Sequence, residues 1–297
     1  MNTPVLLLIF NRPYTTKRVF EAIRKQQPSR LYIAADGARD HVPGEKEKSR
    51  QVREIVKNVD WDCEVKTLYR NNNIGCKTAV SQAITWFFTY EEYGIILEDD
   101  CLPDPSFFQF CEELLIKYKD DERIGHISGN CFLPGEIKKY SYDFSNTAHI
   151  WGWASWRRVW KDFDLDFPFW NNSTKADHEN IFNGFYDRIY FSSFISDTLQ
   201  NKKNISAWDV QYFFTMRLTN RLCIYPAVNL VTNIGLNSEG ATHTSTKNRK
   251  YYVQSEKMVF PLVHPQYILR NKQLDKKAIR KHFFSWKRLM RYYLKMY

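Results

Sequence analysis

The first 130 residues alternate between short strand-like runs of apolar residues and longer segments in which apolar residues recur with helical spacing. The strand-like runs lie at residues 4–10, 30–35, 63–69, 93–98 and 124–128. The segments between them predict helices at about residues 15–25, 45–58, 76–90 and 106–118. Strands that alternate with helices in this way are typical of a parallel sheet covered on both faces. We therefore expect a three-layer α/β/α sandwich with a mostly parallel central sheet.

The alternation stops at about residue 131. Residues 131–265 hold aromatic-rich stretches, a helix that opens at residues 206–209 and a short strand at residues 222–225. From Lys276 to the end, an aromatic stripe is accompanied by eight Lys or Arg residues and no acid, which predicts an amphipathic helix. We expect one domain at residues 1–265, with halves at 1–130 and 131–265, followed by a basic helix at 266–297.

Three consecutive acids, Glu98, Asp99 and Asp100, follow the fourth predicted strand. Ligands of open α/β sheets bind outside the carboxyl ends of the strands. Adjacent carboxylates repel one another, so a site that keeps three together usually offsets their charge with a cation, and carboxylate oxygens suit Mn²⁺ or Mg²⁺. The triplet therefore predicts a metal site, the alternative being a solvated acidic turn.

Polar residues also follow the first and second predicted strands, as Asn11 and Arg12 in one case and Asp36 in the other. The right-handed crossover rule brings these strand ends to the same edge as the acids, which predicts a nucleotide site. Taken singly, each is more often an ordinary loop residue, and only their convergence on one edge is informative. Asn73-Ile74-Gly75 opens a helix with Lys77 in its first turn, a pattern that suits either a bound phosphate or a capped turn.

Candidate chemistry in the second half is carried by aromatic residues, one acid and one histidine. Residues 151–160 contain four tryptophans, which could stack on sugar rings or fill a core. Asp209 lies in the first turn of a predicted helix, where it is either a general base or a partner of the helix dipole. His243 lies in a loop of small and hydroxyl residues that could close over a ligand.

Composition narrows the class of protein. The chain has 297 residues, of which 43% are hydrophobic, enough for a sizeable core. Eight of its ten net positive charges lie after residue 275, so the domain is nearly neutral and a nucleic-acid partner is not expected. Six cysteines form no C-x-x-C pair, which disfavours a disulfide frame or a zinc site. We also expect neither a signal peptide nor a membrane-spanning segment.

Several short motifs occur in an order that resembles bacterial GT-A-fold glycosyltransferases over roughly residues 3–245. The acid triplet also resembles the Glu-Asp-Asp motif of N-acetylglucosaminyltransferase I, although it departs from the strict Asp-x-Asp of many members. The motifs are VLLLIFNRP at 5–13, ADG at 35–37, NIG at 73–75, IILEDDCLP at 95–103, WGWASW at 151–156, Trp208-Asp209 and the loop around His243.

The resemblance implies metal-dependent transfer of a sugar from a nucleotide-diphosphate donor, with UDP-sugar expected, to an acceptor hydroxyl with inversion. It implies that Asp100 and His243 contact Mn²⁺ or Mg²⁺ and that Asp209 is the catalytic base. The donor would be held by Phe10, Asn11, Arg12, Asp36, Asn73, Gly75, Lys77, Glu98 and Asp99. Sugar or acceptor contacts would come from Trp151, Trp153 and Trp208.

The expected acceptor is a glycan or lipid-linked oligosaccharide of surface polysaccharide synthesis. The basic helix would then hold the protein on the inner, cytoplasmic face of the membrane, unless it docks on the domain or on a second copy. Two alternatives remain. One is a non-catalytic nucleotide-sugar or carbohydrate-binding protein. The other is a sugar-phosphate nucleotidyltransferase, which is disfavoured because Phe10-Asn11-Arg12-Pro13 stands where that class has a Gly-rich loop.

Overall fold

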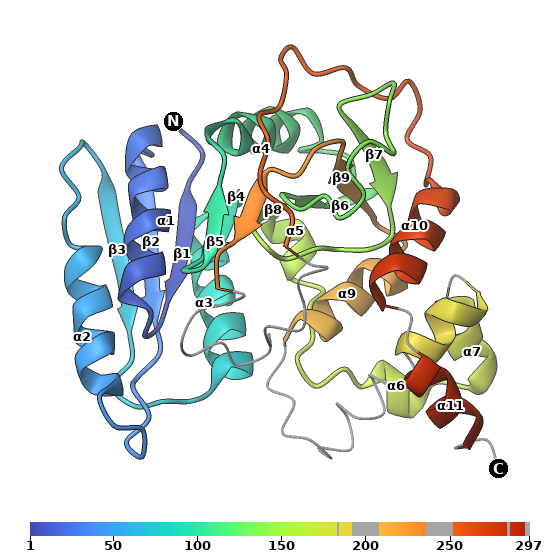
Figure 1. Cartoon of the computed structure of the whole chain (residues 1–297), viewed down its shortest axis with the longest axis horizontal. Coiled ribbons are helices and arrows are strands. Elements are labelled where there is room, and N and C mark those ends of the chain that lie inside the picture. The colour runs from blue at the N-terminus through green and yellow to red at the C-terminus, as the bar shows by residue number, and fades with distance from the viewer. Residues whose placement is uncertain (183, 192–207, 236–251, 284–285, 295–297) are drawn as a thin grey trace.

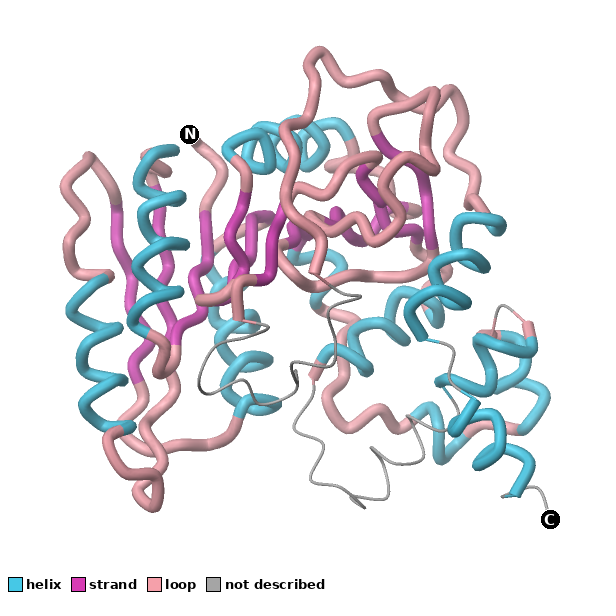
Figure 2. Tube along the Cα trace, in the orientation of Figure 1, coloured by secondary structure: helices cyan, strands magenta, loops and turns pink. Residues whose placement is uncertain are grey.

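An eight-stranded sheet runs through the centre of the protein, in the strand order β3-β2-β1-β4-β8-β6-β9-β7 (Figures 1 and 2). The structure is a computed structural model that describes residues 1–182, 184–191, 208–235, 252–283 and 286–294. Six of the eight strands run in one direction, because only β7 and β8 pair antiparallel to their neighbours. The expected α/β fold with a mostly parallel central sheet is therefore confirmed.

The first half of the chain builds the parallel side of the sheet. Its strands are β1 (Val5–Ile9), β2 (Arg30–Ala35), β3 (Glu64–Tyr69) and β4 (Tyr93–Glu98). Its helices are α1 (Pro13–Gln26), α2 (Glu45–Ile55) and α3 (Cys76–Tyr90). All of β1 is buried, as expected of a central strand with helices on both faces. Helices α1 and α2 pack against each other on one face, whereas α3 packs with α5 (Figure 1).

The rest of the large sheet includes strands that the hydrophobic pattern did not predict, namely β7 (Tyr142–Ser145) and β8 (Trp153–Trp156). They lie with β6 (Ile124–Ser128) and β9 (Leu222–Pro226), which match the strands expected at residues 124–128 and 222–225. Strand β8 lies between β4 and β6 and runs antiparallel to both. A second, two-stranded sheet pairs β5 (Cys101–Pro103) with β10 (Val231–Asn233). This small sheet carries the chain from the second half back to the end of β4.

The described helices that follow β5 are mostly short, although the first of them matches the helix expected at residues 106–118. They are α4 (Pro105–Lys117), α5 (Arg157–Trp160), α6 (Phe169–Asn172), α7 (Lys175–Asn180), α9 (Asp209–Leu218), α10 (Lys272–Ala278) and α11 (Trp286–Leu294). A π-helical turn at Ile279–Phe283 follows α10 directly. The carboxylate of Asp104 accepts a hydrogen bond from the Ser106 amide at 2.9 Å and so caps α4.

The C-terminal segment divides into a docked part and an exposed part. Leu274 and Ala278 of α10 are buried against Leu133 and Tyr225 of the domain. The Ser145 hydroxyl donates to Asp275 at 2.6 Å and ties α10 to β7. Helical structure in this segment begins at Lys272, and α11 presents apolar side chains such as Trp286 and Leu294 to solvent. Residues 284 and 285, just before α11, lie outside the described residues. Among the described residues, none of the helices combines the length and apolar character that crossing a membrane requires.

Candidate active site

The acid triplet lies at the carboxyl end of β4, beside the carboxyl end of β1. The two strands pair in register, with Leu8 opposite Glu98. The Phe10 amide donates to Asp99 Oδ2 at 3.1 Å. Arg12 Nη1 contacts Asp100 Oδ2 at 2.6 Å and Asp99 Oδ1 at 3.4 Å. The residues that follow the first and fourth strands are thus brought together, and Arg12 bridges two of the three acids.

Burial makes this group of acids electrostatically costly. Burial and the neighbouring charges of Asp100 and Asp99 raise the pKa of Glu98 to about 8. Burial and the charge of Asp100 likewise raise the pKa of Asp99 to about 7, against the opposing effect of Arg12. One guanidinium therefore does not offset three carboxylates. A divalent cation would supply the missing positive charge, so the donor set fits Mn²⁺ or Mg²⁺.

The acid triplet could supply only some of the ligands of a divalent cation. Among the described residues, no group of three or more His, Cys, Asp or Glu side chains is arranged to hold a metal. Mg²⁺ is commonly held by one or two carboxylates together with substrate phosphates, so a closed protein cage is not required. The second predicted metal contact, His243, lies outside the described residues.

Asp209 lies in the first turn of α9, as the sequence predicted. Its negative charge contributes to the raised pKa of Glu98 and to that of Cys76, the first residue of α3. Burial is the largest cause of the shift at Cys76, which raises its pKa to about 12. Asp209 is therefore close enough to both residues to act on them electrostatically, although about 110 positions separate it from the triplet in the sequence.

The Asp36 side chain, after β2, holds the loop at the start of α3 through hydrogen bonds. Its carboxylate accepts hydrogen bonds from the Gly37 amide at 2.9 Å, the Asn73 side chain at 3.0 Å and the Gly75 amide at 3.1 Å. Gly75 has a φ of 84°, which favours glycine, and α3 begins directly after it. The carboxylate of Asp36 thus takes backbone and side-chain donors at the start of α3 that the sequence assigned to a phosphate. A ribose contact by Asp36 and phosphate contacts by Asn73 and Gly75 stay predictions.

Asn11 also has a partner within the protein. Its side-chain amide donates to Glu45 Oε1 at 2.8 Å, and Glu45 forms an ion pair with Arg39 at 2.5 Å. Asn11 therefore connects the end of β1 to the start of α2. Lys77 lies in the first turn of α3, half-buried. Nucleotide contacts by Asn11 and Lys77 stay predictions.

The tryptophans separate into core and partly exposed residues. Trp153 has 0% of its surface exposed, and its ring stacks on Trp208 with centroids 5.9 Å apart. Trp208 is 3% exposed. The expectation that these two side chains contact a sugar does not hold, because both rings are covered by protein. Trp151 is half-buried against Phe132, so a sugar contact there stays a prediction.

Gly235 was not singled out by the sequence, yet it borders the triplet directly. The Ile234 amide donates to the Asp100 carbonyl at 2.8 Å, and a Cβ atom at position 235 would overlap the Asp100 carboxylate. The Gly235 amide donates to Asn233 Oδ1 at 2.9 Å, which closes the turn after β10. A glycine that follows a short apolar strand was the available signal, but its partner lies 135 positions earlier.

The comparisons with known proteins show similarity of fold. Neither a protein-family model nor a curated protein matches the chain. A UDP-glucose pyrophosphorylase complexed with UDP-glucose aligns with a TM-score of 0.41 and 9% identity, over 79% of this chain and 94% of that chain. A cytidylyltransferase from Leptospira borgpetersenii aligns with a TM-score of 0.34 and 11% identity, over 55% of this chain. The match spans 64% of that cytidylyltransferase, slightly less than two thirds of its length.

A third similar structure is a 4-diphosphocytidyl-2C-methyl-D-erythritol synthase from Anaerococcus prevotii, with a TM-score of 0.35 and 6% identity. It aligns over 59% of this chain and 80% of that chain. Two of these three proteins are named as a pyrophosphorylase and a cytidylyltransferase, the nucleotidyltransferase class kept as an alternative above. Identities and TM-scores this low describe the arrangement of helices and strands and leave the reaction open.

Proposed function

We propose that the protein is a metal-dependent glycosyltransferase that moves a sugar from a nucleotide-diphosphate donor, UDP-sugar being the first candidate, to an acceptor hydroxyl with inversion. The observation that carries the proposal is the acid triplet at the end of β4, in which Asp99 and Asp100 are buried. Arg12 contacts two of its members, and Asp209 lies within electrostatic reach of the third. Sites built at the carboxyl ends of parallel strands are the usual ligand sites of open α/β sheets.

In this proposal the strand ends hold the donor. Asp100 would hold the metal, and Asp99 and Arg12 position the nucleotide beside the Phe10 backbone. A divalent cation at Asp100 would supply positive charge next to the leaving nucleoside diphosphate. Arg12 contacts Asp99 and Asp100 from the β1 side and adds positive charge at the same place. The turn at Gly235 limits the space next to Asp100, since even a methyl group there would overlap the carboxylate.

Asp209 is the proposed general base. It takes the proton of the acceptor hydroxyl while the hydroxyl oxygen bonds to the anomeric carbon. The bond between that carbon and the phosphate oxygen breaks, and its electron pair leaves with the nucleoside diphosphate. Attack opposite the leaving group inverts the anomeric centre. A positioned base of this kind contributes about 10²–10⁴-fold in rate.

A sugar-phosphate nucleotidyltransferase is the second candidate, because the named structures of similar fold include members of that class. The connection between β1 and α1 opposes it. Strand β1 ends at Ile9 and α1 begins at Pro13, so only Phe10, Asn11 and Arg12 lie between them, and none is glycine. The Gly-rich loop that such an enzyme needs after its first strand is therefore replaced by a short polar turn.

The deciding experiment offers the purified protein two substrate sets with Mn²⁺. UDP-sugars should release UDP, slowly by hydrolysis without an acceptor and faster with one. UTP with a sugar 1-phosphate should release no pyrophosphate. Pyrophosphate release from the second set would instead establish the nucleotidyltransferase. Binding of UDP with Mn²⁺ but no product from either set would indicate a binding protein without catalysis.

The Asp209→Asn variant tests the base. We expect transfer to fall by at least about 10²-fold, because the amide cannot accept the proton. Thermal stabilisation by UDP and Mn²⁺ should persist, because Asp209 does not hold the donor in this proposal. Asp62→Asn, at an exposed aspartate, is the matched control and should transfer normally. Wild-type transfer by Asp209→Asn would exclude the residue as the base.

We also propose that α11 holds the protein on the inner face of the cytoplasmic membrane, where a lipid-linked oligosaccharide is the acceptor. Trp286, Met290 and Leu294 are spaced by four residues, so they share one helix face, and they are 72%, 63% and 74% exposed. The sequence of α11 also contains Lys287, Arg288 and Arg291 and no acid. An anionic membrane attracts each such cation by about 1 kcal/mol.

Co-sedimentation with vesicles tests the membrane contact. The protein should bind vesicles of phosphatidylcholine and phosphatidylglycerol more strongly than vesicles of phosphatidylcholine alone. Trp286→Ser combined with Met290→Ser should reduce that binding, because apolar area is removed from the contacting face. Tyr267→Ser, at a residue that is 65% exposed outside α11, is the control. Equal binding by the double variant and wild type would exclude α11 as the anchor.

A further inference from the structure

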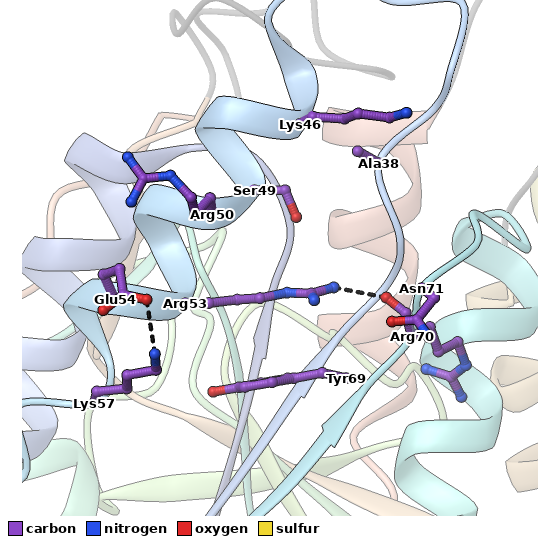
Figure 3. Close-up of a pocket in the computed structure, with 10 residues that line it drawn as sticks. All are labelled: Ala38, Lys46, Ser49, Arg50, Arg53, Glu54, Lys57, Tyr69, Arg70 and Asn71. Carbon is purple, nitrogen blue, oxygen red and sulfur yellow. Dashed lines mark hydrogen bonds and ion pairs between the residues drawn. The ribbon is translucent and has the colours of Figure 1, made fainter.

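A cavity with a strongly cationic wall lies between α2 and the segments that follow β2 and β3 (Figure 3). Its volume is about 440 Å³. Five of its lining residues are Lys or Arg and one is Glu, and none belongs to the acid triplet or to β1. The lining residues are Ala38, Lys46, Ser49, Arg50, Arg53, Glu54, Lys57, Tyr69, Arg70 and Asn71. The cavity is thus separate from the candidate active site and opposite to it in charge.

Arg53 forms the floor of this cavity. Its Nη2 donates to the carbonyl oxygens of Asp36 at 3.2 Å and Arg70 at 2.7 Å, and its guanidinium lies 5.0 Å from the centre of the Tyr69 ring. Figure 3 shows the side chain reaching from α2 across to the loop, with Tyr69 beneath it. Within the described part of the chain, no carboxylate lies within ion-pair distance of Arg53, and its Nε has no hydrogen-bond partner.

A second guanidinium at the cavity is also without a carboxylate partner among the described residues. Arg70 donates to the amide oxygen of Gln82 at 3.1 Å, a neutral acceptor. Buried or half-buried cations are usually paired with an anion, because removing them from water is otherwise unfavourable. Two arginines at one cavity therefore leave positive charge that a ligand can neutralise, and the planar guanidinium fork matches phosphate oxygens.

Helix α2 adds the other cations along one face. Lys46, Arg50 and Arg53 follow one another at intervals of three or four residues, which places them on the same side of the helix, and Lys57 lies just past its end at Ile55. Lys46 pairs with Asp40 at 2.8 Å and Lys57 with Glu54 at 2.7 Å. Both pairs are solvent-exposed, and such pairs contribute little, so a phosphate can displace either carboxylate. A flat basic face would have neither this volume nor an arginine such as Arg53, which has no carboxylate partner among the described residues.

We propose that this cavity is a second binding site, which takes a ligand with adjacent phosphate groups, as in a diphosphate. The volume exceeds what a single phosphate needs, and five cations around it suit more than one negative group. The site lies beyond the loop closed by Asp36, so it would be occupied independently of a donor at the acid triplet. The inference does not depend on the reaction proposed above.

Isothermal titration of the full chain with inorganic pyrophosphate tests the site. Lys46→Gln combined with Arg70→Gln should weaken binding at least tenfold, and so should Arg53→Gln. Lys48→Gln removes the same charge from the same helix outside the cavity and should bind as wild type. Arg53 also contacts backbone carbonyls, so its variant is checked by its melting temperature, and the Lys46/Arg70 variant decides if Arg53→Gln does not fold.

Arg12→Gln separates this inference from the proposed function. Loss of pyrophosphate binding in Arg12→Gln but not in the Lys46/Arg70 variant would place the anion at the acid triplet and overturn the second site. Equal weakening by Lys48→Gln would show attraction by net charge alone and overturn it as well. The donor site is tested by a different measurement, namely the thermal stabilisation of the wild-type protein by UDP with Mn²⁺. The proposed function can therefore fail or hold independently of the second site.

A vesicle-binding experiment distinguishes a lipid-borne diphosphate from a soluble one. Phosphatidylcholine vesicles with and without a polyprenyl diphosphate are compared, using wild type and the Lys46/Arg70 variant in the presence of the α11 substitutions. Weaker retention of the variant on the diphosphate vesicles would assign the site to a lipid-borne diphosphate. Equal retention, together with weaker pyrophosphate binding, would assign it to a soluble ligand.

Discussion

Different interactions stabilise the two halves of the protein internally. In the first half, the strands β1, β2 and β4 are mostly apolar, and the pair of Arg50 with Glu47 on α2 is exposed. In the second half, Arg217 and Asp187 form an ion pair whose side chains are both 2% exposed. Arg221 contacts Asp162 and Glu122, which are 59 and 99 positions away in the sequence.

This difference shows what each half needs for a defined structure. Apolar strands joined by helices specify their neighbours through short connections, and the hydrophobic effect supplies the stability. The second half joins short elements that are distant in sequence, and buried arginines such as Arg217 and Arg221 connect them through ion pairs. Buried ion pairs add little net stability compared with apolar packing, but breaking one is costly.

The largest expected effect is that of Asp187→Asn. The substitution leaves the Arg217 guanidinium buried without its carboxylate, and loss of one partner of a buried pair typically costs about 3–5 kcal/mol. Chemical denaturation should show this loss in the free energy of unfolding. Glu47→Gln, which breaks an exposed pair in the first half, should have a much smaller effect, because solvent screens that pair. Similar small losses for both variants would contradict the contrast between the halves.

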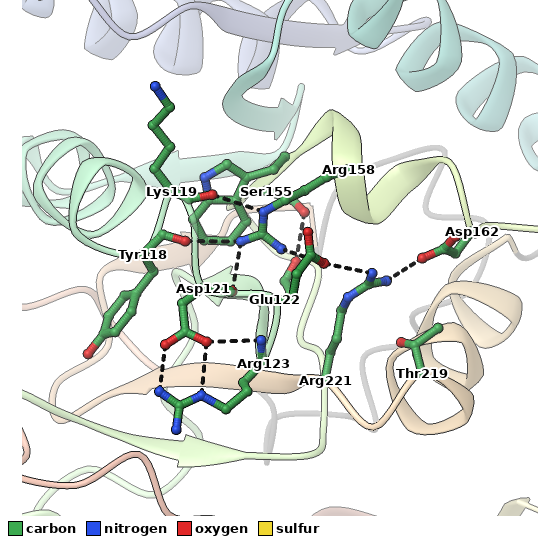
Figure 4. A network of polar contacts seen from close by, with 12 residues as sticks. Tyr118, Lys119, Asp121, Glu122, Arg123, Ser155, Arg158, Asp162, Thr219 and Arg221 are labelled. Carbon is green, nitrogen blue, oxygen red and sulfur yellow. Dashed lines mark hydrogen bonds and ion pairs between the residues drawn. The ribbon is translucent and has the colours of Figure 1, made fainter.

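An intermediate effect is expected at Arg221, which is part of the polar network in Figure 4. Its side chain is 9% exposed and contacts Asp162 Oδ2 at 2.5 Å and Glu122 Oε2 at 3.1 Å. Arg221→Gln should lower the free energy of unfolding by about 1.5–3 kcal/mol, the range for hydrogen bonds to charged groups.

A double-mutant cycle sharpens this prediction. The Asp162 side chain is 32% exposed and that of Glu122 is 64% exposed, so solvent screens the second pair more. Arg221 should therefore couple more strongly to Asp162 than to Glu122, as measured with Asp162→Asn and Glu122→Gln. The reverse order would show that exposure does not govern the strength of these contacts.

Most of the first half could be predicted from the sequence because its signals are local. The apolar run at residues 4–10 contains β1, which spans Val5–Ile9. The acid triplet begins at Glu98, the last residue of β4. Strand β8 could not be predicted in the same way. Its four residues, Trp153–Trp156, suit sugar stacking as well as a core, and only pairing with β4 and β6 decides between them. That pairing depends on contacts far apart in sequence.

The candidate site shows the same division. Arg12 and the acids were predicted because each follows a strand directly, and the structure brings them together. Asp36 was also predicted from its position after a strand. That its carboxylate accepts hydrogen bonds from residues 73–75 could not be predicted, because those residues approach it only in the folded chain. Gly235 reaches the site through the small sheet of β5 and β10, which no local pattern predicted.

The smallest effect is expected at Arg123, although it belongs to the same network as Arg221 (Figure 4). Arg123 Nη2 contacts Asp121 Oδ2 at 2.7 Å, but its side chain is 64% exposed and its partner is only two positions away. The contact therefore joins no distant segments, and water screens it. Arg123→Gln should lower the free energy of unfolding far less than Arg221→Gln does. If Arg123→Gln lowered the free energy of unfolding as much as Arg221→Gln, the contacts of the network would depend on one another, and exposure would not determine the contribution of each.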